Sequence, residues 1–183
     1  YNCTQSETVK RAQLEDLPGT PTALLLDAHR AVVGLGSPLL SLGGKSGFVG
    51  TALTIGAGSL AQWKALDSAT PGQVLVLACG SRRDRAEFGE IFVGIALRKG
   101  IAALVTDGLL RDREAIGLLD IPVFACGNHP ASPADPAPGQ VGFPVNLFGK
   151  QICTGDIIVG DDDGLAVIPT HELSGVLSRI NEQ

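Results

Sequence analysis

Three mainly apolar runs lie in the middle of the chain and are separated by segments with helical spacing. Such runs are typical of parallel strands buried on both faces, and they span Gln73–Leu77, Ile101–Thr106 and Ile121–Ala125. Between the first two, apolar residues recur at i, i+3, i+4, i+7 and i+8 from Phe88, and Gly100 follows, which predicts a helix. Arg111–Leu119 predicts the next helix. The alternation indicates a parallel βαβαβ unit.

The flanks of this unit predict further elements of both kinds. Val49–Ile55 has the composition of another buried strand, and Phe143–Pro169 alternates apolar runs with turn dipeptides, which predicts antiparallel strands. Gly127–Gly142 contains four prolines and is predicted to be a long loop that serves as a lid or a subunit contact. The predicted flanking helices are Leu17–Ala31, Trp63–Ser68 and His171–Asn181. We therefore expect an α/β domain in which the parallel unit is layered with an antiparallel β-rich part.

The composition fits one compact domain. The chain has 183 residues, of which 44% are hydrophobic and 18% charged. We expect a single domain over residues 1–183, with residues 1–16 as a peripheral N-terminal helix or arm. The net charge is −5 and no basic run is long enough to follow a phosphate backbone, which argues against direct binding of nucleic acid. No apolar stretch approaches the roughly 20 residues that a membrane span needs.

The four cysteines give no sign of a structural or metal-binding framework. They lie far apart and form no Cys-x-x-Cys pair; they are Cys3, Cys79, Cys126 and Cys153. Neither a dense disulfide scaffold nor a zinc ribbon is indicated. We expect buried or bystander thiols in a reducing, cytoplasmic setting.

Three motifs have simpler interpretations than a binding site. Gly43–Ser46 (GGKS) resembles the end of a phosphate-binding loop, but Leu39 stands where that loop needs a glycine, and a strand follows. The acidic segment Asp161–Gly164 could hold a hard cation, although its place between two apolar runs favours a solvated hairpin turn. The histidines are scattered, which favours surface or loop positions over a metal site; they are His29, His129 and His171.

The strongest candidate site combines two short segments, Gly89–Phe92 and Arg111–Asp112, each just past a predicted parallel strand. Successive strand-to-helix connections meet at the carboxyl ends of the strands, so we expect both segments in one crevice. The helix N-terminus at Gly89–Phe92 favours a carboxylate. Arg111 can neutralise an oxyanion, and Asp112 can ligate Mg²⁺. From spacing alone, a helix-capping Asp beside a surface Arg is at least as good an interpretation as a site.

The longer segments around these residues resemble the RraA-like family. They include PGQVLVLACG, AEFGEIFVGIALRKGIAALVTDGLLRD, IPVFACG and PVNLFGKQICTGDIIVGDDDGLAVIP; with GTPTALLLDA and FVGTALTI the likeness extends from Gly19 to Pro169. The family includes class II 4-hydroxy-4-methyl-2-oxoglutarate/4-carboxy-4-hydroxy-2-oxoadipate aldolases and regulators of ribonuclease activity A. The resemblance implies the swivelling β/β/α fold and a homotrimer, or a hexamer of two trimers, with active sites at subunit interfaces.

The resemblance also implies roles for individual residues. The family's aldolases carry an acidic residue, twenty spacer residues and then Arg-Asp, which matches Glu90, Arg111 and Asp112. Asp112 would bind Mg²⁺ or Mn²⁺, and Arg111 would contact the substrate's oxygens. The backbone of Gly89, Glu90, Ile91 and Phe92 would hold the pyruvoyl carboxylate.

Two positions depart from the aldolase pattern. Ala115 stands where the aldolases place a further acid, and the nearest acid is Glu114. Glu90 stands where they carry Asp. Ala115 weighs more against aldolase activity, because non-aldolase relatives can keep Arg-Asp while losing the later acid.

The implied reaction is the metal-dependent retro-aldol cleavage of a 4-hydroxy-2-oxo dicarboxylic acid to pyruvate and a second oxo acid, with oxaloacetate decarboxylation as a side activity. Arg111 would stabilise the oxyanion. A base, such as a metal-bound water positioned by Glu90 or by a neighbouring subunit's carboxylate, would remove the C4 hydroxyl proton. The alternative is a non-catalytic regulator that binds a partner protein such as a ribonuclease. A methyltransferase is disfavoured, because the chain lacks a Gly-rich cofactor loop between a strand and a helix.

Overall fold

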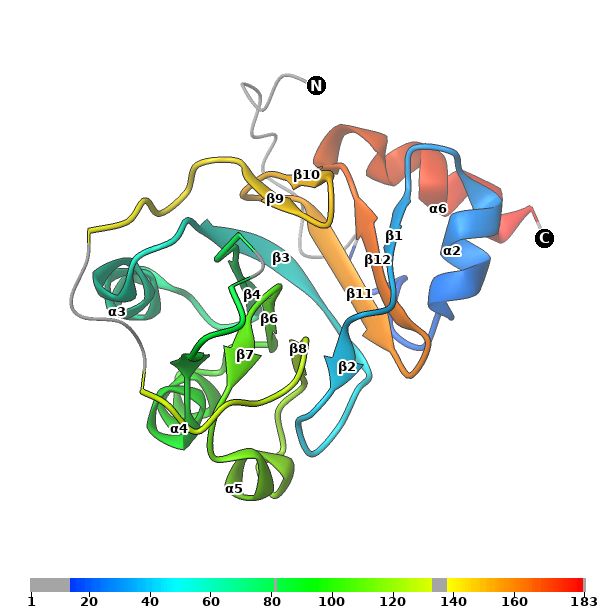
Figure 1. Ribbon diagram of the computed structural model, residues 1–183. Coiled ribbons are helices and arrows are strands. Elements are labelled where there is room, and N and C mark those ends of the chain that lie inside the picture. Colours follow the sequence, from blue (N-terminus) through cyan, green and yellow to red (C-terminus); the bar gives the residue numbers. More distant parts are fainter. Residues whose placement is uncertain (1–13, 81, 133–137, 183) are drawn as a thin grey trace.

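A mixed eight-stranded sheet forms the centre of the computed structural model, which describes residues 14–80, 82–132 and 138–182 (Figure 1). Its strands are β1 (Val33–Leu35), β2 (Leu40–Ser41), β3 (Phe48–Ile55), β4 (Gln73–Leu77), β6 (Ala103–Thr106), β8 (Val123–Ala125), β11 (Ile157–Asp161) and β12 (Gly164–Ile168). Parallel pairing joins β3, β4, β6 and β8 in that order. Antiparallel pairing adds β11, β12 and β1 beyond β3, and β2 beyond β8. The parallel unit therefore contains the three predicted strands and, in addition, β3.

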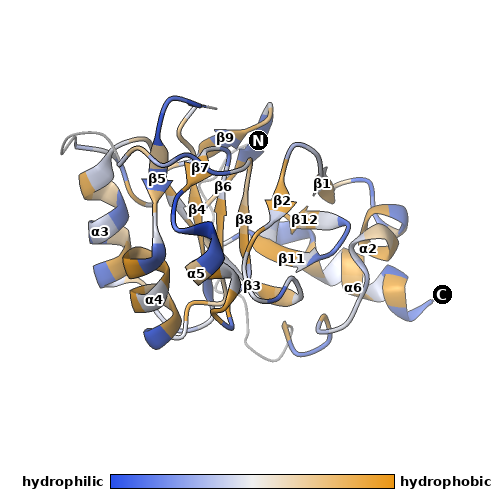
Figure 2. Ribbon diagram, turned by 60° about the horizontal axis from the view of Figure 1, so that its bottom comes forward, coloured by the Kyte–Doolittle hydropathy of each residue, from blue (hydrophilic) through white to orange (hydrophobic). Residues whose placement is uncertain are grey.

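Separate groups of helices cover the two halves of the sheet (Figure 1). The parallel half carries α3 (Ser59–Ser68), α4 (Glu90–Arg98) and α5 (Arg113–Gly117). The antiparallel half carries α2 (Thr22–Ala28), the short 3₁₀ helix η1 (Thr170–Glu172) and α6 (Leu173–Asn181). In Figure 2 the strands between these groups are coloured mainly as hydrophobic, as expected for strands covered on both faces.

Alternate residues of the central strands enter different cores. Leu75 and Leu77 of β4 belong to the core beneath α3 and α4, whereas Val74 and Val76 belong to a core shared with Ile158 of β11. The parallel and antiparallel halves thus share a core within one mixed sheet. A third core lies beneath α2 and α6.

Two small strand pairs complete the fold. β9 (Val145–Leu147) and β10 (Lys150–Ile152) form an antiparallel hairpin, and β5 (Ala86–Phe88) and β7 (Leu109–Leu110) form a parallel pair. Phe88 thus ends a strand, and the helix predicted from Phe88 begins at Glu90. The next helix begins at Arg113 rather than at the predicted Arg111, because the Arg111 N–H donates to the Phe88 carbonyl across the strand pair (3.0 Å).

The motifs assigned to ordinary structure are accounted for by local packing. Asp161 pairs with Gly164 across the hairpin between β11 and β12, so the acidic segment is a turn. The Gly44 N–H donates to the Leu119 carbonyl (3.0 Å), and a Cβ atom at Gly44 would collide with that oxygen. Lys45 forms an exposed ion pair with Asp120 (3.3 Å).

The cysteine prediction needs a correction. Cys79 and Cys126 carry free thiols, but Cys153 is disulfide-bonded. Cys3 lies outside the described residues. Cysteines that are far apart in sequence give no spacing from which pairing could be predicted, which is why the composition pointed to free thiols.

Parts of two predicted segments lie outside the described residues. They are residues 1–13 of the predicted N-terminal arm and residues 133–137 of the predicted proline-rich loop. The end of that loop is held on the parallel half, since the Gly56 N–H donates to the Gln140 carbonyl (2.8 Å). Within the described ranges, no helix is long and apolar enough to cross a membrane.

Candidate active site

The two predicted segments of the site meet through a direct contact. The Glu90 N–H, at the start of α4, donates to Asp112 Oδ2 (3.1 Å). The β5–β7 pair makes this contact possible, because one strand leads into Gly89 and the other leads into Arg111 and Asp112. The structure therefore brings together Glu90 and Asp112, which are 22 positions apart in the sequence.

The backbone at this junction is specialised. A Cβ atom at Gly89 would collide with Asp112 Oδ2 and would lie only 2.9 Å from Arg111 Cγ, so only glycine lets the two side chains approach. Asp112 itself has a left-handed backbone conformation (φ 61°, ψ 37°). Such a conformation is costly for a residue with a side chain, although Asp tolerates it better than most, and it recurs at functional sites.

A cleft of about 140 Å³ opens between α3 and the start of α4. It is lined by Ser59, Gln62, Trp63, Glu87, Phe88, Gly89, Ile91, Phe92, Arg111 and Asp112. Five of the six predicted site residues are in this lining. The sixth, Glu90, has an exposed side chain that does not line the cleft, and it contributes its N–H instead.

Two buried donor atoms in this cleft have no hydrogen-bond partner among the described residues: Gln62 Nε2 and Arg111 Nε. Gln62 is only 3% exposed. Arg111 Nε lies 3.5 Å from Asp112 Oδ2, which is an ion-pair distance but not a hydrogen bond, while its Nη1 donates to Ser132 Oγ (2.8 Å). Unpaired buried donors cost free energy, so their presence on one cleft favours a ligand that supplies acceptor oxygens.

One wall of the cleft is aromatic. Trp63 of α3 packs edge-on against Phe92 of α4, with ring centroids 5.2 Å apart, and Phe92 also contacts Phe88 (5.5 Å). Trp63 and Ile91 remain 48% and 69% exposed. The cleft therefore combines polar groups from the β5–β7 side with an apolar wall from the helices.

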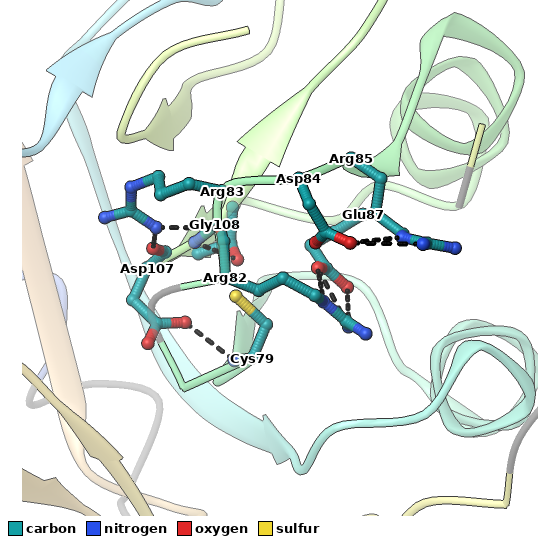
Figure 3. A network of polar contacts seen from close by, with 9 residues as sticks. Cys79, Arg82, Arg83, Asp84, Arg85, Glu87, Asp107 and Gly108 are labelled. Carbon is teal, nitrogen blue, oxygen red and sulfur yellow. Dashed lines mark hydrogen bonds and ion pairs between the residues drawn. The ribbon is translucent and has the colours of Figure 1, made fainter. Parts of the chain in front are cut away.

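Glu87 of the cleft lining belongs to a polar network that sequence reasoning missed (Figure 3). Glu87 is 4% exposed and accepts two hydrogen bonds from Arg82, Nε to Oε1 and Nη2 to Oε2, both 3.1 Å. Burial raises the pKa of Glu87, and the opposing effect of Arg82 only partly offsets it. In the sequence, Glu87 is a single acid between apolar neighbours after a charged stretch, which is the only sign that could have found it.

The inner part of this network is anchored by Asp107. Its Oδ1 accepts the Cys79 N–H (2.7 Å), and its backbone carbonyl accepts Arg83 Nη1 (2.6 Å). Burial, reinforced by the charges of Asp107 and Glu87, raises the pKa of Cys79 to about 12. Cys79 is thus held as an unreactive thiol at neutral pH.

The donor set around Asp112 resembles a partial rather than a complete metal site. Among the described residues, no group of three or more His, Cys, Asp or Glu side chains could hold a metal ion. Of the two acids that line the cleft, Asp112 offers the accessible carboxylate, which is 42% exposed. One carboxylate fits Mg²⁺, which commonly keeps waters or substrate oxygens in its shell. Glu114 lines a different surface depression, with Ser41 and Leu118, and does not replace the acid absent at Ala115.

Fold and site together define a mixed α/β protein whose cleft joins a helix N-terminus, an arginine and a carboxylate at neighbouring strand ends. The family model described as RraA-like, Aldolase/RraA, matches residues 22–167, and the chain belongs to this RraA-like family. This confirms the family and the fold class expected from the sequence.

Three relatives illustrate the likeness. A Halalkalibacterium halodurans protein named "Putative 4-hydroxy-4-methyl-2-oxoglutarate aldolase" is 34% identical over 89% of this chain and 79% of its own length. A Thermus thermophilus protein named 4-hydroxy-4-methyl-2-oxoglutarate aldolase is 30% identical over 75% of this chain and 85% of its own. The solved structure of the RNA-processing inhibitor RraA from Thermus thermophilus has a TM-score of 0.77 and 28% identity, over 82% of this chain and 93% of that chain.

Proposed function

We propose that this protein is a divalent-metal-dependent aldolase that cleaves a 4-hydroxy-2-oxo dicarboxylic acid into pyruvate and a second oxo acid. One observation carries the proposal: two buried donors without a hydrogen-bond partner among the described residues, Gln62 Nε2 and Arg111 Nε, share a cleft with the Asp112 carboxylate. An oxo acid supplies the acceptor oxygens that these donors lack. The names of relatives at 30–34% identity support the same reaction class.

Each group of the cleft has a part in binding the substrate. Arg111 neutralises a carboxylate or enolate oxygen, and Gln62 donates to a second oxygen. The first N–H groups of α4, at Ile91 and Phe92, have no partners within the helix and favour the substrate carboxylate. Asp112 holds Mg²⁺ or Mn²⁺, and such an ion supplies Lewis-acid polarisation of the 2-oxo group. The Glu90 N–H fixes the orientation of the Asp112 carboxylate.

The lysines are not placed for Schiff-base chemistry. No lysine lines the cleft within the described part of the chain. Lys99 donates to the carbonyls of Leu66 and Asp67, and Lys45 is paired at the surface with Asp120. A Schiff-base aldolase needs a lysine with a lowered pKa in the active site, so these positions support the metal-dependent class.

Two finer features belong to the same proposal. Decarboxylation of oxaloacetate leaves the same pyruvate enolate and should occur as a side activity. We also propose a homotrimer, or a hexamer of two trimers, with the cleft at a subunit interface. The apolar residues Leu60, Trp63 and Ile91, which are 41–69% exposed around the cleft, support this assembly because such side chains favour burial against a partner.

Pyruvate release tests the proposal. The protein is supplied with 4-hydroxy-4-methyl-2-oxoglutarate or oxaloacetate, with Mg²⁺ or with EDTA, and pyruvate is measured with lactate dehydrogenase. We expect release from both substrates with Mg²⁺ and none with EDTA. Release that survives EDTA would contradict the metal-dependent class. No release from either substrate would leave the regulator alternative, which the RNA-processing inhibitor among the structural neighbours favours.

A further inference from the structure

The proposed reaction needs a base for the C4 hydroxyl proton, and the cleft offers few candidates. Of the residues that line it, only Glu87 and Asp112 carry a carboxylate. Asp112 is committed to the metal in the proposed function. Glu90 has an exposed side chain outside the lining, and Ala115 cannot act as a base. Among the described residues of one subunit, Glu87 is therefore the lining carboxylate that remains.

Glu87 is held in one orientation. The guanidinium fork of Arg82 donates to both of its carboxylate oxygens, and each oxygen keeps a further lone pair. Close packing restricts the rest of the side chain, because a Cβ atom at Gly108 would lie only 2.6 Å from Glu87 Cγ and 2.7 Å from Cys79 Sγ. A buried carboxylate fixed in this way is suited to accept a proton without reorganisation.

The surroundings of Glu87 hold charges of both signs. Burial favours the protonated form of Glu87 most strongly, with a smaller contribution from the Asp107 carboxylate, whereas Arg82 and the hydrogen bond from the Cys79 thiol favour the ionised form. Arg111 and Asp112 line the same cleft from the other strand of the β5–β7 pair. The net result is a pKa above the ordinary value for Glu, which brings the carboxylate closer to the range useful for proton transfer near neutral pH.

We propose that Glu87 is the general base of the aldol cleavage, an inference that rests on the proposed function. The C4 hydroxyl proton passes to a Glu87 oxygen, and the O–H electron pair forms the C4 carbonyl of the second oxo acid. The C3–C4 bond breaks, and its electron pair becomes the C2–C3 double bond of the pyruvate enolate. Return of the proton from Glu87 to C3 gives pyruvate and restores the carboxylate.

The substitution Glu87→Gln tests this role, because it preserves size and polarity but cannot take a proton. We expect kcat for aldol cleavage to fall by about 10²–10⁴-fold. Decarboxylation of oxaloacetate has no hydroxyl proton to remove, and its enolate can take a proton from water, so it should lose much less activity than cleavage does. Stabilisation of the protein by pyruvate and Mg²⁺ in a thermal melt should also be unchanged. Glu114→Gln, outside the cleft, is the matched control and should retain both activities.

A pH profile separates proton transfer from a structural role. In the wild type, kcat/KM for cleavage should decline on the acid side as Glu87 becomes protonated, and Glu87→Gln should lack that decline in its residual activity. Retention of aldol cleavage by Glu87→Gln would overturn the role while leaving the proposed function standing. Equal loss of cleavage and decarboxylation would also overturn it, since it would point to damage of the cleft. A wild type without aldolase activity would remove the role and the proposed function together.

Discussion

The cleft at Asp112 and the acidic turn at Asp161 both place carboxylates at strand ends, but their hydrogen bonding differs. At the turn, Asp161 accepts the Thr22 N–H and hydroxyl (both 2.8 Å) and the Asp163 N–H (3.0 Å). At the cleft, donor groups of Gln62 and Arg111 have no hydrogen-bond partner within the described residues. The hydrogen-bonding groups of the turn are satisfied by its own chain, whereas the cleft keeps donors available for a ligand. Donors without a hydrogen-bond partner, rather than the density of acids, distinguish the cleft from the turn.

The reason for the difference lies in the neighbouring helices. Pro21 precedes α2 and has no side-chain acceptor, so the first N–H of α2 is capped by Asp161 from a distant hairpin. The α4 N-terminus is instead left facing the cleft, with only the Glu90 N–H bound to Asp112. One helix end therefore serves stability and the other is available for an anion.

The largest expected effect is that of Asp112→Asn. This change keeps a residue that tolerates the left-handed backbone but removes the charge proposed to hold the metal. Mg²⁺-dependent pyruvate release should fall by at least about 100-fold, while the melting temperature should stay within a few degrees. Undiminished turnover in this variant would show that the metal is held elsewhere.

Arg111→Lys should come next. A lysine ammonium retains the positive charge but cannot reproduce the planar fork that faces both the cleft and Ser132. We expect kcat/KM to fall by about 10²–10³-fold. Wild-type kinetics in the Arg111→Lys variant would mean that Arg111 only pairs with Asp112 at the surface. The carboxylate at the cleft would then have a structural role, like the one at the turn.

Asp161→Ala should affect stability and spare catalysis. Three hydrogen bonds to the carboxylate are lost, including the cap of α2, so we expect a loss of about 2 kcal/mol in unfolding free energy. For a chain of this size that corresponds to a fall in Tm of about 4–8 °C. Circular dichroism melts measure the first effect and the pyruvate assay the second. A large loss of activity in the folded variant would break the contrast between the two regions.

The same carboxylate predicts a pH dependence. Burial alone would raise the pKa of Asp161, but the hydrogen bonds from Thr22 and Asp163 outweigh it and hold the pKa below the ordinary value. The stabilisation is therefore fully present above the unfolded pKa of about 4 and is lost as the pH falls through the lower folded pKa. The unfolding free energies of the wild type and Asp161→Asn, measured by urea titration between pH 7 and pH 2, should become equal at the acid end of this range. A difference in unfolding free energy that does not change with pH would show that the stabilisation does not come from the ionised Asp161 carboxylate.

The smallest expected effect is that of Gln62→Met. Replacing the buried amide, whose Nε2 has no hydrogen-bond partner among the described residues, with an apolar side chain of similar length should stabilise the free protein by about 1 kcal/mol. It should also raise KM, because the substrate loses a donor. A thermal melt measures the change in stability, and a kinetic assay on the same sample measures the change in KM. Lower stability together with an unchanged KM would indicate that Gln62 is hydrogen-bonded in the free protein and does not contact the substrate.

The sequence predicted the elements whose periodicity is strong and the residues that stand next to them. The runs that became β4, β6 and β8 are buried on both faces, which gives them their unbroken apolar character. Arg111 and Asp112 could be placed with Gly89 because parallel strands end at one edge of a sheet. The boundaries at Phe88 and Arg111 were wrong, because the short β5–β7 pair depends on tertiary contact rather than on local pattern.

Other parts of the site could not be predicted from local pattern. Gln62 is a polar residue on the buried side of α3, and only the packing of that helix against α4 reveals that it faces the cleft. Glu87 is identified by its burial beside Arg82, five positions away. The exposed side chain of Glu90 results from its position at the first residue of α4, where the backbone rather than the side chain faces Asp112.

The most direct test of the central claim is a calorimetric titration of pyruvate, with and without Mg²⁺, into the wild type and the Asp112→Asn and Asp161→Ala variants. If the cleft is the oxo-acid site, the wild type and Asp161→Ala should bind pyruvate with equal affinity in the presence of Mg²⁺, and Asp112→Asn should not bind it measurably. Equal binding by Asp112→Asn, or loss of binding in a folded Asp161→Ala protein, would contradict the assignment of the site to the cleft.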